Sequence, residues 1–195
     1  NIPVAHIQGG EVTGTIDESI RHSMSKFAHY HFAANQDACD RLVKMGEMQE
    51  RVFNVGCPSI DAILAVRDSQ DVIEKYGLSK PYFLLIQHPV TSEIKKSTKQ
   101  IQITLDAIKQ SSINVLIILP NNDAGYSSII EQIKSSNIQS VKTLSIGDYV
   151  NLLRHSSGLI GNSSSGIHEA ASFDVPVVNV GTRQQGRLRP ENVID

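Results

Sequence analysis

The sequence predicts an α/β protein with parallel sheets, built from parts of two Rossmann-like domains. Apolar segments of strand length alternate with segments of helical periodicity along almost all of the 195 residues. The expected strands are apolar on both sides, as strands are when helices cover both faces of a parallel sheet. A composition of 40% hydrophobic and 19% charged residues is that of an ordinary globular protein.

The expected strands are short runs rich in valine, isoleucine, leucine and aromatic residues, bounded by polar or turn-forming residues. They lie at 4–7, 30–33, 51–55, 82–86, 115–119, 140–144, 158–160 and 175–178.

Helix-opening residues stand between these strands. Asp17 precedes one expected helix and Asn35 precedes another over 36–45, because such side chains accept hydrogen bonds from first-turn N–H groups. Further helices are expected over 94–109, 127–134 and 149–155, opened by Ser92-Glu93, Gly125 and Gly147-Asp148.

A polar, charged stretch over 67–80 is the expected domain boundary, because it separates a helix after Pro58 from a new strand. We expect the C-terminal part of one Rossmann-like domain at 1–67, a linker at 68–80, and most of a second, nucleotide-binding domain at 81–195. The chain opens on a strand without a methionine and stops without a closing helix, so we expect both ends to be cut from a longer protein.

Charge and hydropathy argue against several classes of protein. The net charge is −2 and no basic block occurs, which disfavours nucleic-acid binding. The longest apolar run, near 115–119, is too short to span a bilayer. Cys39 and Cys57 lack metal-ligand spacing and are interpreted as free thiols. No signal peptide opens the chain, so we expect a cytoplasmic protein. We also expect no bound metal.

The segment 161–171 combines glycine and serine after an expected strand. A helix opening there would offer unpaired N–H groups, with hydroxyls beside them, to a diphosphate. Ser163, Ser164 and Gly166 are therefore candidate diphosphate contacts, and Glu169, one turn later, is placed to accept hydrogen bonds from sugar hydroxyls. The alternative is a serine-rich capped turn. The GxGxxG spacing is absent, so a nicotinamide site is not indicated.

His88 and Asn121 follow two other expected strands. Ligands bind at the carboxyl ends of strands in open α/β sheets. A histidine there can hold a phosphate when protonated or move a proton, and Asn121 ends the next strand on the same edge. Loop geometry alone also explains these residues. Several polar strand ends in one domain favour a ligand cleft.

The segment 6–22 leaves an expected strand, runs through a glycine-rich loop and enters a helix. It carries clustered carboxylates, which raise one another's pKa and can divide acid and base duties. They are Glu11, Asp17 and Glu18. The alternative is a helix cap for Asp17 and a solvated helix face for Glu18. Later in the chain, Arg183 and Arg187 lie among glycines in a loop that either faces an anion or is solvated.

These segments together resemble one family. In order along the chain they read HIQGGEVTGTIDESIRHSMSKFAHYHF, QHPVT, PNNDAG, GNSSSGIHEAASFDVPVVN and GTRQQGR. They are similar to the hydrolysing UDP-N-acetylglucosamine 2-epimerases of bacterial capsule and sialic-acid pathways and of the bifunctional animal enzyme. The resemblance implies the glycosyltransferase-B architecture and full-length proteins about twice as long. It implies elimination of UDP to give 2-acetamidoglucal, then addition of water to give N-acetylmannosamine, with no metal or nicotinamide cofactor.

The resemblance also implies residue roles. Asp17 matches a catalytic acid, Glu18 a second carboxylate, and His88 a histidine on the UDP phosphates. Ser163 and Ser164 match diphosphate contacts, Glu169 a ribose contact, and Arg183 an arginine of the site. Many bacterial relatives have a catalytic glutamate where this chain has Gln8. An amide cannot act as a base, so that role either moves to Glu11 or Asp17 or is dispensable.

Alternatives remain open. A close variant acts on a UDP-2,4-diacetamido-trideoxy sugar, and the loop 11–15 would decide between the two sugars. A non-hydrolysing epimerase keeps UDP attached, but the stretch 11–21 resembles the hydrolysing form. A nucleotide-binding fragment without turnover is a further alternative. The expected partners are the small-molecule substrate and, in the full-length protein, further copies in a dimer or tetramer.

Overall fold

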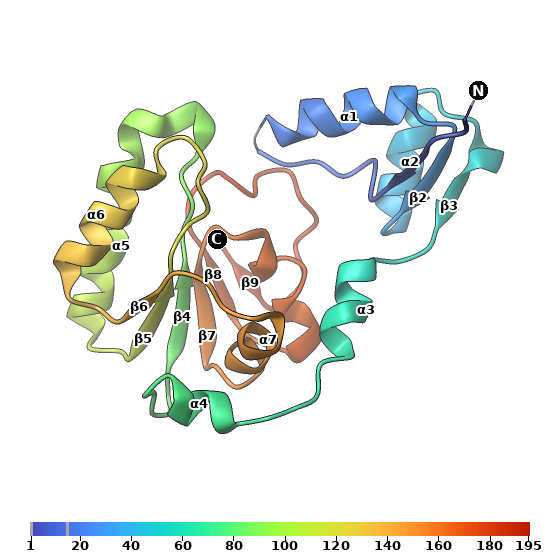
Figure 1. Ribbon diagram of the computed structural model, residues 1–195. Coiled ribbons are helices and arrows are strands. Elements are labelled where there is room, and N and C mark those ends of the chain that lie inside the picture. The colour runs from blue at the N-terminus through green and yellow to red at the C-terminus, as the bar shows by residue number, and fades with distance from the viewer. Residues whose placement is uncertain (1, 15) are drawn as a thin grey trace. The chain divides into compact units, whose positions relative to one another are not determined.

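The computed structural model describes residues 2–14 and 16–195 and has the predicted α/β class with parallel sheets (Figure 1). The chain forms two compact units. One runs up to Asp61 and includes Gln185–Arg187, and the other comprises Ala62–Gln184 and Leu188–Asp195. None of the described helices combines the length and the apolar character that crossing a bilayer requires.

The first unit is a parallel sheet in the order β1-β2-β3 with helices against one face. In register, His6 lies beside His31, which lies beside Val52. Because side chains alternate along a strand, these residues share one face of the sheet with Ala33. The elements are β1 (Ala5–Ile7), α1 (Asp17–Phe27), β2 (Tyr30–Ala33), α2 (Gln36–Lys44), η1 (Gln49–Arg51), β3 (Val52–Asn54) and α3 (Pro58–Leu64), whose C-terminal end belongs to the second unit.

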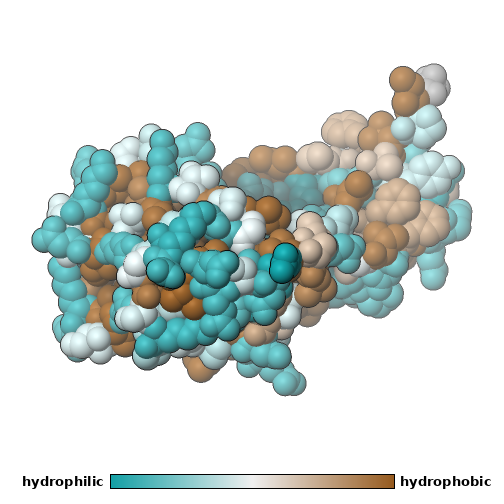
Figure 2. All heavy atoms as spheres, turned by 60° about the horizontal axis from the view of Figure 1, so that its bottom comes forward, coloured by the Kyte–Doolittle hydropathy of each residue, from teal (hydrophilic) through white to brown (hydrophobic). Residues whose placement is uncertain are grey.

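Helix α2 supplies the apolar core of this unit. Asn35 caps it as predicted, because the Asn35 side chain accepts a hydrogen bond from the Ala38 N–H at 2.9 Å. Ala38, Cys39 and Leu42 pack against Ala33 and Val52. Helix α1 is different: its buried Ser25 hydrogen-bonds His6 Nδ1 at 3.0 Å, whereas Met24 and Phe27 are exposed. Figure 2 shows such hydrophobic side chains, in brown, at the surface.

The second unit is a parallel sheet in the order β6-β5-β4-β7-β8-β9. Its strands are β4 (Phe83–Ile86), β5 (Val115–Ile118), β6 (Ser140–Val141), β7 (Gly158–Gly161), β8 (Val177–Asn179) and β9 (Val193–Ile194). Its helical segments are α4 (Asp71–Lys75), η2 (Thr91–Lys96), α5 (Ser97–Ser111), α6 (Tyr126–Ser136), α7 (Ile146–Arg154), η3 (Ser164–Gly166) and η4 (Ala170–Phe173).

Each face of this second sheet carries its own core. Leu85 packs with residues of α5 and α6, including Ile101 and Ile129. Leu84, the neighbour of Leu85 on β4, packs on the opposite face with Leu152 of α7. This alternation is why the strands are apolar throughout, as the sequence predicts. Figure 1 shows α5 and α6 together on one side of the sheet.

Some predicted boundaries were wrong. The strand expected over 140–144 ends at Val141, and β9 was missed because it contains only Val193 and Ile194. The helix expected from Ile94 begins at Ser97, since residues 91–96 form a 3₁₀ segment with non-helical dihedrals at Glu93. The helix expected from Tyr149 begins at Ile146, because the Ser145 hydroxyl, rather than Asp148, caps it.

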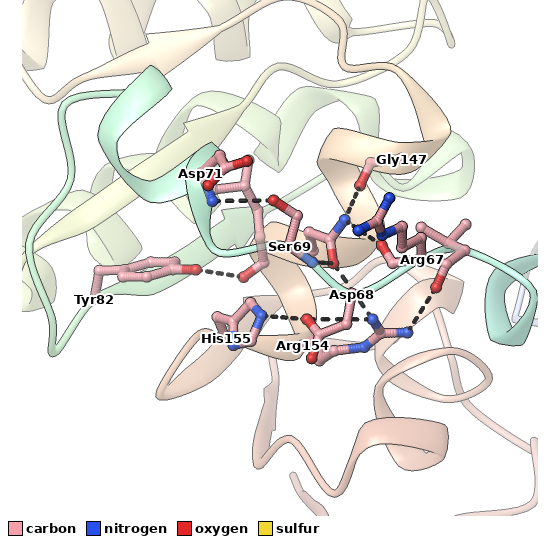
Figure 3. Close-up of polar contacts among 11 residues, drawn as sticks. Arg67, Asp68, Ser69, Asp71, Tyr82, Gly147, Arg154 and His155 are labelled. Carbon is pink, nitrogen blue, oxygen red and sulfur yellow. Dashed lines mark hydrogen bonds and ion pairs between the residues drawn. The ribbon is translucent and has the colours of Figure 1, made fainter.

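The interval predicted as a linker, 68–80, contains α4, and the start of this interval is tied to α7 (Figure 3). Asn151 donates to the Arg67 carbonyl and accepts from the Ser69 N–H, each at 3.1 Å. His155 Nε2 lies 2.7 Å from Asp68 Oδ1. Backbone groups outside a regular element are thus satisfied by side chains of a helix, which holds this segment to the second unit.

Candidate functional site

The predicted loop residue His88 lies just beyond the end of β4, beside the end of β7. Its backbone N–H donates to Asn162 Oδ1 at 2.7 Å, and its carbonyl accepts from Asn162 Nδ2 at 2.8 Å. Asn162 follows β7 directly. The carboxyl ends of these two parallel strands therefore meet around one buried amide, at the sheet edge where α/β proteins bind ligands.

The His88 ring is neutral near pH 7. Burial, and then the nearby Arg183 guanidinium, lower the pKa of His88 to about 4. The Asn121 N–H points at Nδ1 from 3.4 Å, a long contact that makes Nδ1 the acceptor and leaves the proton of the neutral ring on Nε2. The sequence suggested that a protonated histidine could hold a phosphate. His88 is instead neutral near pH 7 and offers the phosphate a neutral N–H donor.

This lowered pKa predicts a pH dependence of stability. Between pH 6.5 and 4 the unfolded chain binds a proton at His88 that the folded chain does not, so the free energy of unfolding decreases as the pH falls through this window. The loss at His88 is at most about 3 kcal/mol. Urea unfolding at pH 7 and pH 4.5 measures it.

The matched control is His88→Gln, which removes the titrating ring and retains a polar side chain. His6, whose pKa is also lowered by burial, titrates in both proteins, so the difference between their pH slopes isolates His88. Equal slopes for wild type and variant would contradict the assignment.

The serine loop after β7 is not the regular helix that the sequence predicts. It forms two short 3₁₀ segments, η3 and η4, instead. Ser163 caps η3, because its Oγ accepts from the Ser165 N–H at 3.3 Å. The Gly166 N–H is also in use, donating to the Ser163 carbonyl at 3.2 Å. Hydroxyl groups, more than a helix terminus, are what this loop offers a ligand.

Two more polar groups lie near the serine loop: Glu169, which was a candidate from the sequence, and Tyr149, which was not. The Tyr149 hydroxyl hydrogen-bonds the Ser165 hydroxyl, and burial and then Glu169 raise the pKa of Tyr149. Glu169 Oε2 is buried without a hydrogen-bond partner. A buried carboxylate oxygen without a donor is costly, which favours a ligand hydroxyl as its partner. Tyr149 was missed because its helical position resembles a core residue.

A pocket of about 810 Å³ opens next to these residues, within the second unit. Apolar side chains from β4 and β5 and the rings of Tyr126 and Tyr149 form much of its lining, together with His88 and Asn121. Lys134 and Lys142 also line it, and its lining includes no carboxylate. The size suits a nucleoside-sized ligand, and the charge favours an anion.

The loop after β8 contains Arg183, a candidate from the sequence, and Gln184, which was not a candidate. Arg183 Nη1 donates to the Asn162 carbonyl at 3.2 Å, and Gln184 Nε2 donates to the same oxygen at 2.8 Å. Arg183 is therefore held beside the His88 loop, whose histidine it influences electrostatically. No sequence spacing relates Arg183 and Gln184 to His88, which lies far from them in the chain.

The other predicted site residues lie in the first unit. Glu18 Oε2 accepts from the Thr13 N–H at 2.9 Å, so this carboxylate orders its own loop. Glu11 Oε2 lies 3.9 Å from Arg187 Nη2, which pairs an expected anion-facing arginine with a protein carboxylate. Gln8 has a left-handed φ of 61° and donates to Cys57 Sγ at 2.6 Å.

Asp17 does not cap α1. It is the first helical residue and is exposed, and the preceding position is Ile16, which makes no side-chain cap. The expected alternative of a structural cap was therefore wrong. Thr15, part of the loop expected to decide between sugars, lies outside the described residues.

Comparison with known proteins places the chain among sugar-nucleotide epimerases. Residues 1–194 match the UDP-N-acetylglucosamine 2-epimerase family. The chain is 42% identical, over all of its length and 54% of the relative, to a hydrolysing UDP-N,N'-diacetylbacillosamine 2-epimerase of Legionella pneumophila. It is 37% identical, over 98% of its length and 52% of the relative, to the UDP-N-acetylglucosamine 2-epimerase of Neisseria meningitidis.

Solved structures agree on the fold. The UDP-GlcNAc 2-epimerase of Methanocaldococcus jannaschii, in complex with UDP-GlcNAc and UDP, matches with a TM-score of 0.78 at 16% identity, over 95% of this chain and 55% of that one. The Neisseria meningitidis enzyme bound to UDP-GlcNAc gives 0.75 at 19% identity, over 95% and 54%. These matches confirm the predicted glycosyltransferase-B-like fold. The chain spans about half the length of the relatives that it matches. The chain therefore belongs to the UDP-N-acetylglucosamine 2-epimerase family.

Proposed function

We propose that the protein containing this chain is a hydrolysing epimerase that converts UDP-N-acetylglucosamine to UDP and N-acetylmannosamine. The observation that carries the proposal is the pocket of about 810 Å³ at the strand ends of the second unit, whose lining has two lysines and no carboxylate. A nucleoside diphosphate is an anion with a flat, largely apolar base, and such a pocket complements it.

In this proposal UDP binds along the ends of β4, β5 and β7. The base lies against Tyr149, and the ribose hydroxyls donate to the unpartnered Glu169 Oε2. The diphosphate receives hydrogen bonds from the hydroxyls of Ser163 and Ser164 and from His88 Nε2. Asn121 and Arg183, held beside His88, complete the anion site.

The chemistry requires more than UDP binding. A base removes the proton on carbon 2 while the bond from carbon 1 to UDP breaks, which gives 2-acetamidoglucal. Water then adds a hydroxyl at carbon 1 and a proton at carbon 2. We assign the acid and base work to the carboxylates Asp17, Glu18 and Glu11, because Gln8 cannot accept a proton. Stabilising the departing diphosphate is the task of His88 and the serines.

The identity of the sugar has a second candidate. The 42% identity to the Legionella enzyme favours a UDP-2,4-diacetamido-trideoxy sugar as much as UDP-N-acetylglucosamine. A relative from Escherichia coli named as a polysialic acid biosynthesis protein supports a role in sialic-acid or capsule biosynthesis. Both cysteines are free thiols, which suits the cytoplasmic location that we propose together with a homo-oligomeric full-length enzyme.

The test is to incubate the full-length protein with each of the two UDP-sugars and to follow free UDP and free 2-epimeric sugar. We expect both products in equal amounts from one substrate. A UDP-linked epimer without free UDP would indicate the non-hydrolysing reaction instead. If neither substrate reacts although UDP binds, the nucleotide-binding alternative replaces the proposal.

A further inference from the structure

We propose that Asn162 is a positioning residue that holds His88 and the 183–184 loop in one arrangement around the phosphate end of the site. The inference rests on the proposed function for its effect on UDP, but its structural part stands on hydrogen bonds within the second unit alone. Asn162 does not belong to the predicted site residues, and it is only 2% exposed.

The side chain of Asn162 extends the sheet by one step. The pairing of β4 with β7 ends at Ile86 and Gly161, where φ at Gly161 is 128° and the regular ladder stops. Gln87 follows the end of β4 and precedes His88, whose N–H and carbonyl then bond the Asn162 side chain at 2.7 and 2.8 Å. A primary amide supplies a donor and an acceptor together, as a paired strand would.

The backbone of Asn162 binds two more segments. Its N–H donates to the Ile86 carbonyl at 3.1 Å. Its carbonyl accepts from Arg183 Nη1 at 3.2 Å and from Gln184 Nε2 at 2.8 Å. One residue thereby joins the loops that follow β4, β7 and β8. Buried networks of this kind fix a single arrangement, because every lost partner leaves a desolvated polar group.

The position of the His88 ring follows from this arrangement. With both backbone groups of His88 held, the ring is placed at the lining of the pocket, within reach of the Asn121 N–H. The charged or titratable groups that the described contacts place against Asn162 are His88 and Arg183. Asn162 touches no proposed reacting atom, so it acts through His88 and Arg183 rather than on the substrate.

Asn162→Asp tests the donor half of this amide. At pH 8 a carboxylate keeps the acceptor for the His88 N–H but places a second acceptor against the His88 carbonyl. We expect UDP to bind about tenfold more weakly, since one buried hydrogen bond is replaced by a repulsion. At pH 5 a protonated carboxyl again has an O–H donor, so the deficit relative to wild type should shrink. Asn162→Leu, which has neither group, should show the full deficit at pH 8.

Asn151→Leu is the matched control. Asn151 is 4% exposed and makes side-chain hydrogen bonds to Arg67, Ser69 and Gly147, and none of these four residues belongs to the pocket lining. It should lower the unfolding midpoint without changing UDP affinity. Calorimetric titration of UDP into the wild type and these variants measures the affinities. An Asn162→Asp variant that binds UDP as wild type does at pH 8, or whose deficit is equal at pH 5 and pH 8, would overturn the proposal.

A second readout does not depend on UDP. The pKa of His88, followed by NMR in the absence of ligand, should rise from about 4 toward 6.5 in Asn162→Leu, because a released ring becomes solvated. If wild type fails to bind UDP but this rise is seen, the proposed function fails and the positioning role stands. If Asn162 variants do not fold, Gln184→Leu, which removes one partner of Asn162, should weaken UDP binding, and unchanged binding would count against the inference.

Discussion

Replacing His88 with alanine is expected to lower UDP release from the UDP-sugar at least about 100-fold in the full-length protein. His88 Nε2 is the donor that the neutral ring offers to the diphosphate, and alanine removes it without disturbing the backbone hydrogen bonds to Asn162. Steady-state kinetics, together with UDP affinity from calorimetry, measure the effect, and circular dichroism checks the fold.

Two comparison variants sharpen this prediction. His155→Ala changes a histidine of the same unit that pairs with Asp68, remote from the pocket lining, and should leave UDP release near the wild-type value. Asp17→Asn should keep UDP affinity and lose turnover by a similar or larger factor, because an amide cannot transfer the proton at carbon 2. Near-normal release in both His88→Ala and Asp17→Asn would defeat the assignment of roles.

Gly161→Ala is expected to destabilise the second unit by more than about 4 kcal/mol. A Cβ at Gly161 would overlap the carbonyl oxygen of Ile86 and lie 2.6 Å from its carbon, at the last residue pair of the β4–β7 pairing. The φ of 128° is also unfavourable for any residue with a Cβ. The neighbouring backbone cannot shift without breaking the strand pairing, so the variant should fail to fold or unfold at much lower urea concentration.

The control for this prediction is Gly181→Ala. Gly181 also has a positive φ, of 78°, but a Cβ there meets nothing within 4 Å. It should cost only the conformational strain, about 1 kcal/mol. The difference between the two urea midpoints isolates the steric overlap with Ile86. Similar losses in both variants would show that the overlap is relieved and would contradict the packing argument.

Much of the second unit was predictable because its strands are buried on both faces. Leu84 and Leu85 point to opposite cores, so both must be apolar, and the strand is visible as a continuous apolar run. The broken helix at 164–173 was not predictable in the same way. Capping signals in Ser163 and Ser164 resemble those of a regular helix, and Ser163 does cap η3, so these signals do not distinguish a short 3₁₀ segment from an α-helix.

The residues of the candidate site likewise differ in whether a local sequence signal marks them. His88, Ser163 and Glu169 could be named as candidates because each follows an expected strand or loop signal, and strand ends carry ligands in this fold class. Asn162 and Gln184 carry no such signal. An asparagine beside serines reads as a turn, and its role arises from hydrogen bonds to His88, which is remote in sequence.

From the sequence alone came the α/β class, the order of most strands, the family and the polar loops that bear the candidate site, because periodicity and turn chemistry are local properties of the chain. Only the tertiary structure decided which of those polar groups are already committed, such as Glu18 to Thr13 and Gly166 to Ser163, and which remain open, such as Glu169 Oε2. It also decided the neutral state of His88, since burial and the approach of Arg183 depend on segments that meet only in the folded chain.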